Sequence, residues 1–130
     1  MKTVVICGSK KYKDEIEVFC KGLEALKVVA FPPNFEEPVL ETDFFKSEHI
    51  TKTVFKGLTL EHFDWIRKAD VCFIFNKDNY VGISVSMEIG YASALGKPVY
   101  ALNAKTGDPC RDALIDKIAK TPQDLVKLLY

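Results

Sequence analysis

The stretch Ala69-Asp70-Val71-Cys72-Phe73-Ile74-Phe75-Asn76 opens the part of the chain that decides the fold. Residues 71–75 form an uninterrupted apolar run rich in β-branched and aromatic side chains, which is typical of a strand buried on both faces of a parallel sheet. An apolar helix is expected at 84–95, because a glycine and a proline follow it at the usual offsets past a C-terminus. With a further strand at 99–102, the stretch predicts one βαβ unit.

Glu88 is the unusual residue of this helix, because no other side chain in it is ionisable apart from the phenol of Tyr91. Burying an unpaired carboxylate is costly. One interpretation is a solvated Glu favoured by the helix dipole by about 0.3–1 kcal/mol. The other places Glu88 at the mouth of a pocket, since loops that follow parallel strands emerge where open α/β folds bind ligands. We expect Ser84 or Ser86 to cap the N-terminus of the helix.

The composition predicts a single domain spanning residues 1–130. The 18 basic and 18 acidic residues cancel, so a nucleic acid polymer is not an expected partner, although one small phosphate is still allowed. We expect no membrane association and a cytoplasmic location, because no apolar run is long enough to span a bilayer and a strand begins at once after Met1-Lys2.

The cysteines and histidines lack the paired spacing that metal sites use. They are Cys7, Cys20, Cys72, Cys110, His49 and His62. We expect the cysteines to act as small buried side chains, with Cys110 the most exposed of them. The sequence therefore predicts neither a metal site nor a cofactor.

The N-terminal segment predicts a second place for a ligand. A strand at 3–7 leads into Gly8-Ser9, and an amphipathic helix follows at 14–26. Glycine lets the backbone approach a ligand, and a helix N-terminus attracts anions. One glycine is far less than a dinucleotide or P-loop fingerprint. We favour a ligand-facing role for Gly8 and Ser9, and solvated side chains for the lysines that follow.

The middle of the chain predicts a strand at 28–31, a loop at 34–40 that has the length of a lid, and helices at 43–55 and 59–68 separated by Gly57. The side chains expected to face the sheet from the second helix are Leu60, Phe63, Trp65 and Ile66. His62 falls between the two faces of this helix. It is either a partly buried structural histidine or a group that contacts ligand or transfers a proton.

The C-terminal part predicts a short helix at 111–115, an edge strand at 117–119 and a last helix capped by Thr121. Alternation of strands and helices indicates an α/β fold with a doubly wound sheet of about five parallel strands in the order 2-1-3-4-5. In that order the first and third strands are neighbours. The Gly8-Ser9 loop and the loop that leads to Glu88 would then face one crevice.

Several motifs resemble the nucleoside 2-deoxyribosyltransferase family and the related 2′-deoxynucleoside 5′-phosphate N-hydrolases. They are Ile6-Cys7-Gly8-Ser9, Ala69-Asp70, Met87-Glu88-Ile89-Gly90-Tyr91-Ala92 and Ala94-Leu95-Gly96-Lys97-Pro98-Val99. The similarity covers most of the chain and is specific mainly in its second half. It implies a flavodoxin-like fold, a homo-oligomer (a dimer or higher), and a small nucleoside or nucleotide as substrate.

The resemblance also implies that Glu88 is a nucleophile that attacks the anomeric carbon of a nucleoside and forms a glycosyl-enzyme ester. Gly8 and Ser9 would lie against the sugar or a 5′-phosphate, and Tyr12 could stack on the ligand. Water or another base would resolve the ester, which leaves hydrolysis and deoxyribosyl transfer both open.

The chain departs from the family pattern at two positions. Six residues before the nucleophile, where transferases carry Asp and N-hydrolases carry Ser, this chain has Gly82, with Ser84 and Ser86 displaced toward Glu88. Eight residues before Asp70, where N-hydrolases carry an Asp that assists the leaving base, it has His62. Asp43 is a second candidate for that assistance.

The leading hypothesis is cleavage or transfer at the N-glycosidic bond of a nucleoside or nucleoside monophosphate, with Glu88 as nucleophile and His62 or Asp43 as its assistant. The residues expected around the ligand are Gly8, Ser9, Tyr12, Gly82, Ser84 and Ser86. A non-catalytic module that binds a nucleotide or another phosphorylated metabolite on the same fold is the alternative. A structural subunit in which Glu88 pairs with a cation from a partner chain is a third interpretation.

Overall fold

The structure, a computed structural model, describes residues 2–35 and 47–130. Within these ranges strands and helices alternate along the chain. The elements, with η for a 3-10 helix, are β1 (Thr3–Cys7), η1 (Lys10–Tyr12), α1 (Lys13–Ala25), β2 (Val29–Phe31), α2 (Glu48–Lys68), β3 (Val71–Ile74), η3 (Lys77–Asn79), α3 (Ile83–Ala94), β4 (Val99–Ala101), α4 (Pro109–Asp112), β5 (Lys117–Ile118) and α5 (Pro122–Leu129).

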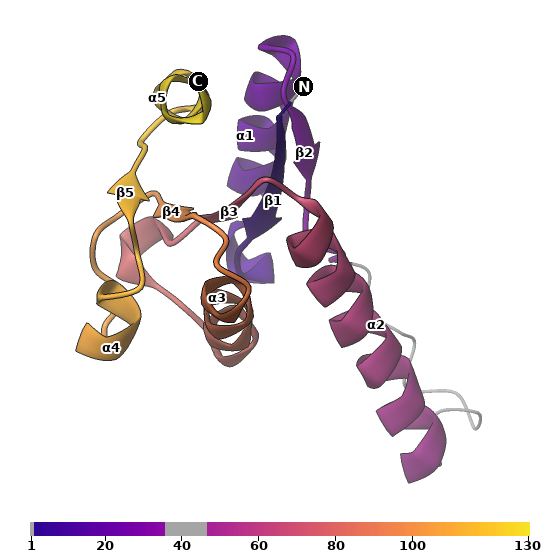
Figure 1. The fold of residues 1–130 in the computed structure, drawn as a ribbon. Coiled ribbons are helices and arrows are strands. Elements are labelled where there is room, and N and C mark those ends of the chain that lie inside the picture. The colour runs from indigo at the N-terminus through magenta and orange to yellow at the C-terminus, as the bar shows by residue number, and fades with distance from the viewer. Residues whose placement is uncertain (1, 36–46) are drawn as a thin grey trace.

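The five strands form one parallel sheet in the order β2-β1-β3-β4-β5 (Figure 1). The predicted α/β class, strand number and strand order are confirmed, and the topology is flavodoxin-like. In the central pair, Val5 lies opposite Cys72 and Cys7 lies opposite Ile74. The carboxyl ends of β1 and β3 are therefore side by side, as the argument from strand order requires.

Helices cover both faces of the sheet. The buried side chains of α1 and α5 share one apolar core, and those of α2 and α3 share the other. Along β1 the side chains alternate, so that Val4 and Ile6 enter the first core while Val5 and Cys7 enter the second. Cys7 is thus turned toward the layer that carries α2 and α3.

Helix α2 differs from the two helices predicted for this part of the chain, because it continues through Gly57. A helix-interior glycine costs only about 1 kcal/mol relative to alanine, which the surrounding turns offset. Ser47 caps the helix by accepting from the Ile50 amide. Residues 36–46, which include Asp43 and most of the loop predicted at 34–40, lie outside the described residues.

The predicted inner face of α2 is correct at Ile66, which is fully buried, and wrong at Leu60, which is 53% exposed. Successive residues rotate by about 100° around a helix, so a residue six positions before Ile66 lies about 120° away from it. Figure 1 shows that the N-terminal end of α2 also lies away from the sheet.

The predicted serine cap of α3 is wrong. The N-cap position is occupied by Gly82, which has no side chain to accept from the first turn. The Ser86 hydroxyl instead donates back to the Gly82 carbonyl at 2.9 Å, and Ser84 is exposed. Helix α3 therefore begins without a side-chain cap, beside the loop that follows β3.

The C-terminal elements follow the prediction with small shifts. Helix α4 begins at Pro109, before the expected start, with Asp108 as its cap, and β5 has only two residues. Thr121 caps α5 by accepting from the Asp124 amide at 3.1 Å. Of the helices in the described ranges, none combines the length and apolar character that crossing a bilayer requires.

Candidate active site

A cavity of about 820 Å³ opens at the carboxyl edge of β1 and β3. A volume of this size lies within the range of small-molecule sites, roughly 300–1,000 Å³. The loop after β1, helix α2, the loop before α3 and the first turns of α3 all contribute to its wall. The predicted site residues that line it are Gly8, Ser9, His62, Gly82, Ser84, Ser86 and Glu88.

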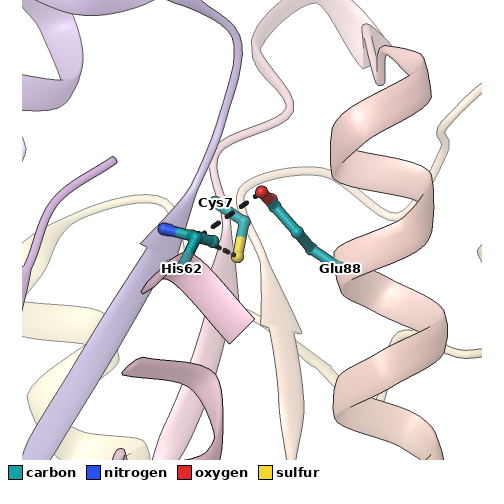
Figure 2. A group of neighbouring side chains, drawn as sticks. All are labelled: Cys7, His62 and Glu88. Carbon is teal, nitrogen blue, oxygen red and sulfur yellow. Dashed lines mark hydrogen bonds and ion pairs between the residues drawn. The ribbon is translucent and has the colours of Figure 1, made fainter. Parts of the chain in front are cut away.

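Three side chains from three different elements meet at the wall of this cavity (Figure 2). Cys7 comes from the end of β1, His62 from α2 and Glu88 from α3. The His62 Nε2 atom lies 3.3 Å from the Cys7 Sγ atom and 3.6 Å from the Glu88 Oε1 atom. The side chains of His62 and Glu88 are 12% and 14% exposed, whereas Cys7 is fully buried.

Burial controls the charge of these groups. Desolvation raises the pKa of Glu88 from 4.5 to about 7, and a hydrogen bond from Cys7 lowers it in part. Desolvation lowers the pKa of His62 from 6.5 to about 4. The pKa of the Cys7 thiol is raised well above its ordinary value, first by burial and then by the neighbouring Cys72. Between about pH 4 and pH 7 the site is therefore mostly uncharged, and the His62–Glu88 contact is not an ion pair.

Glu88 has the properties expected of a reactive carboxylate. Its pKa near 7 lets it ionise close to neutral pH, and His62, whose Nε2 atom lies 3.6 Å from it, is neutral there. A carboxylate held this way keeps its basicity and nucleophilicity, because no Lys or Arg of residues 2–35 and 47–130 forms an ion pair with it. Of the two sequence-based interpretations of Glu88, the geometry favours the one that places it at a pocket.

Gly8 and Ser9 have structural roles in addition to lining the cavity. A Cβ atom at Gly8 would lie 2.6 Å from Ile16 Cδ1 and 3.3 Å from Phe75 Cβ, so any larger residue here would displace the buried Ile16 side chain. Ser9 caps η1 by accepting from the Lys11 amide at 3.2 Å.

Tyr12 does not lie where a stacking residue should. Its side chain is 5% exposed and belongs to the core beneath α1, because η1 turns it away from the cavity. Its hydroxyl donates to Asp78 Oδ2 at 3.2 Å, and its ring meets that of Tyr80 edge to face. Tyr80, which is 44% exposed and lines the cavity, is the aromatic residue available to a ligand.

Besides Tyr80, reasoning from the sequence missed Arg111, which lines the cavity, and the site role of Cys7, which lies buried behind its wall. Arg111 of α4 donates to the Ser86 hydroxyl at 2.7 Å and to the Thr106 carbonyl at 2.9 Å. Nothing in its local sequence indicates that α4 reaches the start of α3. Cys7 was interpreted as a buried apolar residue, which is correct for its burial. The signal that could have found its neighbours is the strand order, which places the end of β1 beside the loop to Glu88.

Comparison with solved structures supports the fold assignment. A 2-deoxyribosyltransferase from the psychrotolerant bacterium Bacillus psychrosaccharolyticus aligns over 95% of this chain and 89% of its own, with a TM-score of 0.62 and 21% identity. A conserved protein from Enterococcus faecalis V583 aligns over 98% of this chain and 96% of its own, with a TM-score of 0.61 and 15% identity. The chain shares their fold. No protein-family model matches the sequence, and no curated protein is significantly similar to it.

Proposed function

We propose that the protein cleaves or transfers at the N-glycosidic bond of a nucleoside or nucleoside monophosphate, with Glu88 as the nucleophile. The observation that carries this proposal is the Glu88 carboxylate itself, which lies on the wall of a ligand-sized cavity with a pKa near 7 and, among the residues that the structure describes, no Lys or Arg paired to it. The fold shared with a 2-deoxyribosyltransferase supports the same reaction class.

In this proposal the ionised Glu88 attacks the anomeric carbon of the sugar. The bond between that carbon and the base nitrogen breaks, its electron pair leaves with the base, and the base takes up a proton from solvent water in the cavity. Water then replaces Glu88 at the anomeric carbon and releases the sugar, or a second base does so and completes a transfer. The oxocarbenium-like transition state is stabilised by the adjacent negative charge in a poorly hydrated site.

His62 is a positioning residue in this proposal. With a pKa of about 4 it is neutral at pH 7, so it does not deliver the proton to the leaving base as an imidazolium. Its Nε2 atom lies 3.6 Å from Glu88 and can hold the orientation of that carboxylate. Replacement by Gln, which keeps a hydrogen-bonding group, should therefore cost less turnover than replacement by Ala, and each variant should alter the pH profile set by Glu88.

The test is release or exchange of base from a panel of nucleosides and deoxynucleoside monophosphates, followed by chromatography. We expect kcat/KM to rise with pH to a plateau above about 7, because only ionised Glu88 attacks. Glu88→Gln should lower turnover at least about 1,000-fold. Glu24→Gln, which removes an exposed carboxylate on α1, is the matched control. Absence of free or exchanged base for every substrate, or full activity in Glu88→Gln, would refute the proposal.

A non-catalytic binding module is the second candidate. The observation in its favour is that the group beside Glu88 is a neutral His62, where the related N-hydrolases carry an acid. Calorimetry would distinguish the two functions. Binding of a nucleoside monophosphate without turnover, with the same affinity in Glu88→Gln, supports the module and contradicts the enzyme.

We further propose that a second copy of the chain packs beside the cavity. Ile83 and Met87 lie one turn apart on α3 at the rim of the cavity and are 85% and 48% exposed. Light scattering coupled to gel filtration should give at least a dimer, and Ile83→Lys should dissociate it. A monomeric parent chain at micromolar concentration would contradict this.

A further inference from the structure

We propose that Cys7, His62 and Glu88 bind one thiophilic divalent cation, Zn²⁺, at the wall of the cavity. Among the residues that the structure describes, this is the one group of three His, Cys, Asp or Glu side chains close enough to share an ion. Their ligand atoms all lie within 4.8 Å of one another. Each comes from a different element, so the fold and not a local sequence motif assembles the set (Figure 2).

The distances fit tetrahedral coordination. Bonds to zinc of about 2.3 Å from sulfur and about 2.0–2.2 Å from nitrogen or oxygen give ligand–ligand separations of about 3.4–3.6 Å. The Cys7 Sγ to His62 Nε2 distance is 3.3 Å, and the His62 Nε2 to Glu88 Oε1 distance is 3.6 Å. The third pair, Cys7 Sγ and a Glu88 oxygen, lies within 4.8 Å, so this separation shortens by at most about 1.2 Å when an ion is bound.

The ligand types select the metal. Thiolate and imidazole favour zinc over magnesium and calcium, which prefer oxygen ligands. The thiolate of Cys7 and the carboxylate of Glu88 together balance the two charges of the cation, so the bound complex is neutral in a poorly hydrated site. Binding is not a redox step, because the Cys7 thiol forms a bond to zinc and gives its proton to solvent.

The position of the ligands leaves one coordination site open. Cys7 lies fully buried behind the other two, whose side chains are partly exposed to the cavity. An ion that enters from the cavity therefore keeps its fourth position toward solvent, where water binds. Three protein ligands and a water are the usual arrangement of an accessible zinc site. One consequence rests on the proposed function. Zinc should inhibit base release, because a Glu88 carboxylate that is bound to zinc cannot attack the sugar.

The test uses Co²⁺ as a spectroscopic probe on the full chain, kept reduced and metal-free, with Cys110→Ser removing the exposed thiol. We expect a thiolate-to-cobalt charge-transfer band that saturates at one equivalent and is displaced by Zn²⁺. Cys7→Ala should abolish the band, and Cys72→Ala should retain it. His62→Gln and Glu88→Gln should each weaken cobalt binding at least about tenfold.

Absence of the band at stoichiometric cobalt overturns the site, as does a band that survives Cys7→Ala. If circular dichroism shows that Cys7→Ala does not fold, the test uses His62→Gln and Glu88→Gln instead. An unchanged cobalt affinity in both of these variants overturns the site. The readout is independent of turnover. A chain that binds cobalt but releases no base when it is assayed metal-free refutes only the proposed function. A chain that releases base, is not inhibited by zinc and does not bind cobalt refutes only the metal site.

Discussion

Replacing Glu88 by Gln should stabilise the protein while it removes activity. The pKa of Glu88 is about 7 in the folded chain, against an ordinary value of 4.5. Each pKa unit corresponds to about 1.36 kcal/mol, so ionised Glu88 lowers the free energy of unfolding by ~3 kcal/mol relative to its neutral form. Glutamine has nearly the same shape as the protonated side chain and carries no charge at any pH.

The sign of the pH dependence follows from proton binding. Between about pH 4.5 and pH 7 the folded chain keeps the Glu88 proton that the unfolded chain has lost, so the parent loses stability as pH rises. The free energy of unfolding of Glu88→Gln should therefore equal that of the parent near pH 4.5 and exceed it increasingly through pH 6. The difference should reach its full value of ~3 kcal/mol above pH 7. Urea unfolding of both chains at four pH values, followed by circular dichroism, measures this difference.

His62→Gln is the internal control, because its effect has the opposite pH dependence. The pKa of His62 falls from 6.5 to about 4 on folding, so the parent loses stability as pH falls through this range while His62→Gln does not. The reasoning is refuted if the difference between Glu88→Gln and the parent is the same at pH 5 and pH 8. It is also refuted if Glu88→Gln is less stable than the parent at pH 8.

Three further substitutions test the packing that supports the site. Gly57→Ala should stabilise by about 1 kcal/mol in urea unfolding, because an added Cβ meets nothing within 4 Å on α2; a loss of stability would contradict a continuous helix there. Gly8→Ala should destabilise by about 1–3 kcal/mol, because its Cβ collides with the buried Ile16; an unchanged thermal midpoint would count against this close approach. Arg111→Met should cost about 1–3 kcal/mol and raise KM, because the Ser86 hydroxyl and two carbonyls lose their donor; unchanged stability and KM would show that α4 does not hold the start of α3.

The sheet could be predicted from the sequence because its signals are local. Apolar runs such as 71–75 are too short and too rich in β-branched and aromatic residues to be surface helices, and each is followed by turn residues. The predicted strand order is then the simplest doubly wound arrangement that right-handed crossovers allow for five strands. The predicted helix break at Gly57 was also based on a local signal, and it was wrong. A single glycine disfavours helix only weakly, and the helical turns on either side of it outweigh that cost.

The candidate site was predictable only where one residue stood out from its own element. Glu88 did so, as a lone carboxylate in an apolar helix. Cys7 did not, because a cysteine in an apolar strand is ordinary and its contact with His62 spans 55 residues. Tyr12 was placed wrongly because the turn of η1 decides which face of the sheet its ring enters. The direction in which a side chain points after such a turn depends on backbone angles, and the residue types of the turn constrain those angles only loosely.

The strand order has a consequence for how the chain folds during synthesis. Strand β1 is hydrogen-bonded to β2 on one edge and to β3 on the other. In the β1–β3 pair, Val5 lies opposite Cys72, which is 67 residues later in the chain. As the chain leaves the ribosome, β1 and β2 can pair early, but one long apolar edge stays open until β3 has emerged. We expect this nascent intermediate to be the form most prone to aggregation and the one that a chaperone would protect.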